Sequence, residues 1–142
     1  MEENNNIFAD TNFFVALYNL KDSQHKKAVL KRKQIQQAKP KIFISNFVFL
    51  EVVTILSQRA GKILSLKVGK SIIQDQRIEI IQIDKELNDL TWKIFQTIKR
   101  KNLSFVDASI IACMQVEGIN KLLTFDEEDF SNLRKKYRFS FF

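Results

Sequence analysis

Short apolar runs alternate with longer segments of helical periodicity along this chain. The runs predict strands, because they are brief, buried in character and bounded by polar residues. The expected strands cover Ile7–Ala9, Ile42–Ile44, Ile78–Ile83, Leu122–Phe125 and, close to the C-terminus, Phe139–Phe141. The segments between them predict helices over Asn12–Leu20, Asp22–Gln37, Phe47–Gln58, Ile63–Gln74, Lys85–Arg100 and Ser104–Glu117. The third of these segments is apolar nearly all round, which predicts a buried helix.

Strands separated by helices imply parallel pairing through right-handed crossovers. We therefore expect an α/β fold with three layers, in which a central parallel sheet of four or five strands lies between helices. The 142 residues suit a single domain spanning 1–142. In such sheets ligands bind beyond the carboxyl ends of the strands, so candidate functional residues are sought there.

The composition excludes several classes of protein and of site. With 3 Gly and 1 Pro the chain has too few turn formers for an all-β barrel or sandwich. A single cysteine, Cys113, and a single histidine, His25, exclude an internal disulfide and the usual zinc sites. We see no secretory signal and no apolar run long enough for a membrane span, so we expect a cytoplasmic protein without a membrane partner.

Basic residues outnumber acidic ones by 23 to 16, giving a formal net charge of +7. This surplus favours an anionic partner such as nucleic acid, although it also serves solubility alone. The helix expected over Asp22–Gln37 is strongly basic, and it either contacts RNA phosphates or is simply a solvated face. Its candidate contacts to the RNA backbone are Lys26, Lys27, Lys31, Arg32 and Lys33. A second basic stretch, Arg134–Arg138, has the same two interpretations.

Four acidic residues stand at positions that matter in this fold. Asp10 and Asp126 directly follow or end expected strands, and each alone would be read as a turn or helix-cap residue. Glu51 lies within the apolar third helix, where a carboxylate must be paired, protonated or bound to a cation. Asp107 lies three residues after Ser104, a spacing typical of a capping box, and a helix start at the sheet edge also directs its first turn into the cleft.

These four acids come from four distant segments and can converge on one cleft. Carboxylates at close quarters repel each other and need a compensating cation. Mg²⁺ and Mn²⁺ prefer oxygen ligands and require neither His nor Cys. A site of this kind can activate water and hold a phosphodiester for in-line attack, which points to nuclease chemistry.

In order and spacing, these motifs resemble the PIN domain, and in particular the VapC-type toxin ribonucleases of toxin–antitoxin pairs. The resemblance runs nearly end to end. It rests on Ile7-Phe8-Ala9-Asp10-Thr11-Asn12, on Glu51 within its apolar helix, on Leu103-Ser104-Phe105-Val106-Asp107-Ala108, and on Leu122-Leu123-Thr124-Phe125-Asp126-Glu127-Glu128-Asp129-Phe130.

The resemblance implies an endoribonuclease that depends on Mg²⁺ or Mn²⁺, a homodimer, and a small antitoxin as partner. Asp10, Glu51, Asp107 and Asp126 would be the metal-binding and catalytic acids, with Asp129 as a second candidate for the fourth position and Thr11 and Asn12 in support. Two alternatives stay open. One is a catalytically inactive module that binds RNA or protein, and the other is a different Mg²⁺-dependent phosphotransfer enzyme such as a phosphatase.

Overall fold

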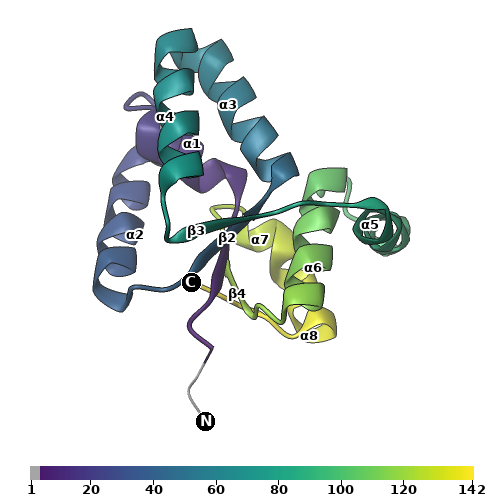
Figure 1. Ribbon diagram of the computed structural model, residues 1–142. Coiled ribbons are helices and arrows are strands. Elements are labelled where there is room, and N and C mark those ends of the chain that lie inside the picture. Colours follow the sequence, from purple (N-terminus) through teal and green to yellow (C-terminus); the bar gives the residue numbers. More distant parts are fainter. Residues whose placement is uncertain (1–3) are drawn as a thin grey trace.

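The computed structural model describes residues 4–142, which fold around one five-stranded sheet (Figure 1). The strands are β1 (Ile7–Ala9), β2 (Ile42–Ser45), β3 (Ile78–Ile81), β4 (Lys121–Leu123) and β5 (Ser140–Phe141). They lie in the order β3-β2-β1-β4-β5, and every neighbouring pair is parallel. The expected α/β class and the parallel central sheet are confirmed, with the larger of the two expected strand numbers.

Helices cover both faces of this sheet (Figure 1). The longer ones are α1 (Thr11–Tyr18), α2 (His25–Ala38), α3 (Asn46–Ala60), α4 (Lys62–Gln74), α5 (Lys85–Thr97) and α6 (Phe105–Glu117). Right-handed crossovers place α1–α4, which connect β1 to β2 to β3, on one face. The return from β3 to β4 places α5 and α6 on the other. The three-layer arrangement follows from this order of connections.

The order of strands also determines where the sheet opens. The chain leaves β1 toward β2 and β3, then returns to build β4 on the other side of β1. This reversal makes a topological switch point between β1 and β4, where helices diverge to opposite faces and leave a crevice beyond the carboxyl ends of the strands. The main-chain N–H of Asp10 donates to the carbonyl of Leu123 at 2.9 Å, so the two strand ends stay side by side.

The core consists of the central strands and the helices that pack against them. Ile7, Phe8 and Ala9 are completely buried, as expected for a strand covered on both faces. All residues of α6 from Ala108 to Met114 are buried too. The edge strand β3 is only half-buried. The buried centre therefore supports the ends of β1 and β4, where the candidate acids stand.

The prediction of an all-round buried α3 is wrong. Its buried positions are Val48, Val52 and Leu56, one stripe at helical spacing, whereas Leu50 is 62% exposed. A second stripe packs on α4, which α3 approaches closely at Gly69. A Cβ atom at Gly69 would lie 3.1 Å from Val53 Cγ1, so glycine permits this contact. Two helices packed as a hairpin over a sheet leave their outer faces in solvent. Packing within the domain therefore does not account for the exposed apolar residues on these faces.

The C-terminal segment contains elements that the sequence did not predict. Between β4 and β5 lie α7 (Glu127–Phe130), a 3₁₀ turn (Ser131–Leu133) and α8 (Arg134–Tyr137). Helices of four residues are too short to show helical periodicity. The expected last strand is present but shorter, and β3 ends two residues earlier than expected. Across residues 4–142, none of the helices has the length and apolar character needed to cross a bilayer.

Candidate active site

A cleft of about 320 Å³ opens beyond the carboxyl ends of β1 and β4. The four acids predicted from the sequence all line it, although they are separated by up to 116 positions of the chain. The lining residues are Asp10, Thr11, Asn12, Val15, Asp22, Glu51, Ile55, Arg59, Asn102, Ser104, Asp107 and Asp126. Most of these side chains come from loops and helix starts, because these segments follow the carboxyl ends of the strands at the switch point.

Asp10 lies deepest in the cleft, only 4% exposed, where β1 ends and α1 begins. As the N-cap of α1 it accepts a hydrogen bond from the Thr11 N–H at 2.7 Å, which fixes one carboxylate oxygen. Burial first, and then the negative charge of Asp107, raise the pKa of Asp10 from 3.8 to about 7. The strand end therefore holds a carboxylate where its charge is unfavourable without a cation beside it.

Thr124 joins the parts of this site and was missing from the expected site residues. Its hydroxyl is buried and donates to Asp10 Oδ2 at 2.9 Å. Thr124 Oγ1 also accepts hydrogen bonds from the Asn12 side-chain amide at 3.3 Å and from the main-chain N–H of Asp126 at 3.0 Å. One hydroxyl group thus sets the relative positions of three candidate residues. Its place one residue after β4, in the run Thr-Phe-Asp, was the available signal.

Glu51 and Thr11 are directly connected across the cleft. The Thr11 hydroxyl donates to Glu51 Oε1 at 2.7 Å, so the start of α1 orients an acid from the middle of α3. Glu51 is half-buried, and the expectation that it has little water to face is therefore not met. Its helix stripe faces the cleft rather than the core. The Thr11 hydroxyl therefore contacts one of the four candidate acids.

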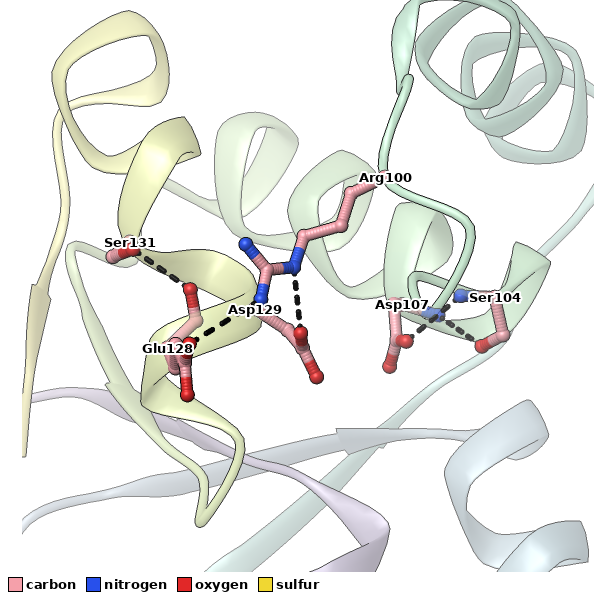
Figure 2. A network of polar contacts seen from close by, with 6 residues as sticks. All are labelled: Arg100, Ser104, Asp107, Glu128, Asp129 and Ser131. Atoms are coloured by element: carbon pink, nitrogen blue, oxygen red, sulfur yellow. Dashed lines mark hydrogen bonds and ion pairs between the residues drawn. The ribbon is translucent and has the colours of Figure 1, made fainter.

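Asp107 combines a helix cap with a position on the cleft wall. Its N–H donates to the Ser104 hydroxyl at 3.1 Å, and its Oδ2 accepts from the Ser104 N–H at 2.8 Å, as Figure 2 shows. This is the capping box expected from the sequence. Burial raises the pKa of Asp107, and the charges of Asp126 and Glu51 add to that rise. Asp107 can therefore cap α6 and face the cleft at the same time.

The structure distinguishes the two candidates for the fourth acid. Asp126 lines the cleft and accepts from the Asn12 amide at 3.2 Å. Asp129 instead accepts from Arg100 Nε at 2.7 Å and does not line the cleft. Figure 2 shows Arg100 directed at Asp129 and Glu128, apart from Asp107. Asp129 therefore forms an ion pair with Arg100, which links α7 to the segment before α6.

The net charge of the cleft is negative, because five acidic side chains and one basic side chain line it. None of the ion pairs found among residues 4–142 involves Asp10, Glu51, Asp107 or Asp126. Carboxylate, hydroxyl and amide oxygens are the donors that Mg²⁺ and Mn²⁺ prefer, so the donor set fits a hard divalent cation. In the described part of the chain, no three acidic, histidine or cysteine side chains stand close enough to enclose one ion. The cleft therefore suits a partly hydrated cation, because Mg²⁺ usually keeps several waters and binds only one or two protein carboxylates.

The candidate basic contacts lie outside the cleft wall. Lys26, Lys27, Arg32 and Lys33 are exposed on α2, and Lys31 is half-buried because its Nζ donates to the main-chain oxygen of Phe142. The Nζ of Lys27 lies 5.2 Å from the ring centre of Phe125, the residue before Asp126. Among the lining residues with basic or amide side chains, Arg59 and Asn102 were not expected. The spacing of eight residues between Glu51 and Arg59, two helical turns, was the signal for the first.

Comparison with known proteins places the chain in a family. The family profile described as PIN domain matches residues 7–136. The chain is 31% identical over 126 residues to the 23S rRNA-specific endonuclease VapC20 of Mycobacterium tuberculosis, an alignment that covers 88% of this chain and 92% of that protein.

Solved structures share the fold. The crystal structure of Mycobacterium tuberculosis VapC20, described as a sarcin-ricin loop cleaving toxin, superposes with a TM-score of 0.75 at 27% identity and covers 89% of this chain and 94% of that one. A toxin–antitoxin complex from Klebsiella pneumoniae gives a TM-score of 0.63 at 23% identity, with 89% and 92% covered. With the profile matching almost the whole chain, the protein belongs to the PIN domain family.

Proposed function

We propose that this protein is a metal-dependent endoribonuclease, the toxin of a toxin–antitoxin pair, and that a single domain carries the activity. The observation that carries the proposal is the unneutralised acidic cleft at the switch point between β1 and β4. Membership of the PIN family and the likeness to an rRNA-specific endonuclease support the same activity. By that likeness, structured ribosomal RNA is the first substrate class to test.

Asp10, Glu51, Asp107 and Asp126 would hold a partly hydrated Mg²⁺ or Mn²⁺ in this proposal, one or two of them directly and the others through the waters of the ion. Bound there, the cation would supply the positive charge that admits a phosphodiester and would lower the pKa of an attacking water. The chain's own residues maintain the geometry. Thr124 holds Asp10, Thr11 holds Glu51, and Asn12 holds Asp126. Hydrogen bonds that hold metal ligands in place commonly contribute about 10- to 100-fold to metal affinity or activity.

RNA cleavage that requires a divalent cation tests the proposal. Purified protein incubated with bacterial ribosomal RNA is expected to produce a discrete cut, mapped by sequencing of the new 5′ ends, when Mg²⁺ or Mn²⁺ is present. Excess EDTA is expected to abolish the cut, and the Asp107→Asn protein is expected to lack it. Asn retains an acceptor for the Ser104 N–H, so the capping box is preserved while the negative charge is lost.

Two other outcomes would favour the alternatives. RNA binding without cleavage at any metal concentration would identify a binding module. Hydrolysis of p-nitrophenyl phosphate without RNA cleavage would identify a phosphatase. Each result removes the nuclease, because both metals and both substrates are supplied in the same series.

We further propose that RNA reaches the cleft along α2. The exposed residues Lys26, Lys27, Arg32 and Lys33 would contact phosphates without reading sequence, and Lys31 would serve mainly to anchor the C-terminus. Lys27 supports this path because it stands beside Phe125, the residue before the cleft residue Asp126. If RNA follows this path, cleavage is expected to weaken steeply with rising salt concentration, and less steeply when these four basic residues are replaced. An unchanged dependence of cleavage on salt would contradict the path.

The antitoxin is expected to occupy an apolar groove between α3 and α4. This groove has a volume of about 650 Å³, with Phe49 and Val53 on its floor and the exposed Leu66 and Ile73 on its rim. An amphipathic helix that lays its apolar face into such a groove is a common mode of recognition. The similar structure from Klebsiella pneumoniae is a complex of toxin and antitoxin, which supports a protein partner of this kind.

Leu66→Glu is expected to weaken antitoxin binding by at least about 100-fold, as for a residue central to an interface. The side chain is 62% exposed, so folding and RNA cleavage are expected to be unchanged. Calorimetry with the antitoxin, once a neighbouring reading frame that encodes it is identified, measures the affinity. Leu30→Glu on α2, 58% exposed and outside the groove, is the matched control. Equal affinities of the two variants would place the antitoxin elsewhere.

We also propose a homodimer, formed through an aromatic face of α3, α5 and α6. Phe105 packs against Phe47, Trp92 and Phe95 there, yet Trp92 remains 53% exposed. Large aromatic side chains left in solvent are typical of contact surfaces. Sedimentation velocity at tens of micromolar protein reads the mass directly, and a monomer at that concentration would contradict the dimer.

A further inference from the structure

Arg59 is the one basic side chain in the set that lines the acidic cleft. It stands in the last turn of α3, eight residues after Glu51, and Ile55 lies between them on the same lining stripe. Residues four apart share a helix face, so Glu51 and Arg59 face the cleft together. At a rise of about 1.5 Å per residue their Cα atoms are about 12 Å apart along the helix axis.

The surroundings of Arg59 leave its charge available. It is exposed and takes part in none of the ion pairs found among residues 4–142. Asp22 also lines the cleft, but its Oδ1 accepts from the Gln24 N–H at 2.8 Å. The cleft wall therefore presents several negative charges in the centre and a single positive charge toward one end.

We propose that Arg59 binds a backbone phosphate of the RNA that flanks the cut bond. This inference rests on the proposed nuclease function and adds the anchor that the negative cleft requires. A strand entering the cleft would be repelled by its acids, and a guanidinium fork offers two parallel hydrogen bonds to a phosphate. Its distance from Glu51 along α3 places it at a neighbouring phosphate and not at the scissile one.

A purely structural role for Arg59 makes different predictions. A basic residue in the last turn of a helix is stabilised by the partial negative charge of that end, by up to about 1 kcal/mol. Loss of that role would lower the melting temperature and leave RNA affinity unchanged. RNA affinity and its salt dependence therefore separate a phosphate anchor from a helix cap.

The test compares Arg59→Gln and Arg59→Lys with Lys67→Gln, a change at an exposed lysine of α4 outside the cleft. Cleavage of an oligoribonucleotide spanning the mapped rRNA cut gives KM and kcat. We expect Arg59→Gln to raise KM about tenfold with kcat changed less than about twofold, and Arg59→Lys to lie between it and the wild type. Lys67→Gln is expected to match the wild type.

Binding is measured separately on the Asp10→Asn background, in which the oligoribonucleotide stays intact. Fluorescence anisotropy over a series of salt concentrations should show a slope of log affinity against log salt that is smaller by about 0.7 when Arg59 is replaced, the share of one phosphate on a single strand. An unchanged slope and an unchanged KM in a cleaving enzyme would overturn the role of Arg59 alone. Wild-type protein that cleaves no RNA would overturn the nuclease itself.

Discussion

Replacing Asp10 by asparagine is expected to raise the free energy of unfolding of the metal-free protein by about 3 kcal/mol at pH 8. The carboxyl group has a pKa of about 7 in the folded protein, against 3.8 when it is unperturbed. Each unit of that difference corresponds to about 1.4 kcal/mol, so the charged carboxylate costs roughly 4 kcal/mol above pH 7. Asparagine removes this cost and loses about 1 kcal/mol through its poorer hydrogen bond with Thr124.

The sign follows from the direction of the shift. Below the unfolded pKa both states are protonated and the carboxyl group costs nothing. Between about pH 4 and pH 7 the unfolded state ionises first, so the cost grows with pH and is complete above 7. At pH 5 the cost of Asp10 is therefore less than half of its value at pH 8, and the net gain from asparagine falls to within about 1 kcal/mol of zero.

Urea unfolding in EDTA at pH 5 and pH 8 measures this difference. Asp84→Asn is the matched control, because Asp84 is also a helix N-cap but lies exposed at the start of α5, outside the cleft. Asparagine is an equally good N-cap, so the control is expected to change stability by less than about 0.5 kcal/mol at both pH values. A stability gain for Asp10→Asn that is equal at the two pH values would contradict the electrostatic origin of the effect.

The sequence located the acids because they are tied to backbone features with a clear pattern. Asp10 directly follows β1, Asp126 lies three residues after the end of β4, and the capping-box spacing marks Asp107. In parallel α/β sheets these places meet at one edge, so the pattern is enough to bring the residues together. The fold class followed in the same way, from short apolar runs that alternate with segments of period 3.6.

What the sequence left open depends on contacts between distant side chains. The hydroxyl of Thr124 reaches Asp10 over 114 positions of the chain, and no local pattern encodes such a bond. The exposure of Glu51 was misjudged because an apolar helix can divide its apolar residues between the sheet and a second helix. The ion pair between Arg100 and Asp129 likewise joins segments 29 positions apart.

The fourth acid of the site is expected to be Asp126 and not Asp129, and a matched pair of substitutions decides it. Asp126→Asn is expected to lower the rate of RNA cleavage by at least about 100-fold, since even residues that only support a metal ligand often contribute 10- to 100-fold. Asparagine still accepts the hydrogen bond from Asn12, so the loss is one of charge in the cleft.

Asp129→Asn is expected to change the cleavage rate by less than about threefold, because Arg100 holds that carboxylate away from the cleft. Its effect should fall on stability. The Arg100 side chain is only 37% exposed, so removing its partner is expected to lower the free energy of unfolding by about 1 kcal/mol. Cleavage at several Mg²⁺ concentrations, with urea unfolding of both variants, separates the two roles. Comparable losses of cleavage in both variants would mean that Arg100 releases Asp129 to the metal during turnover.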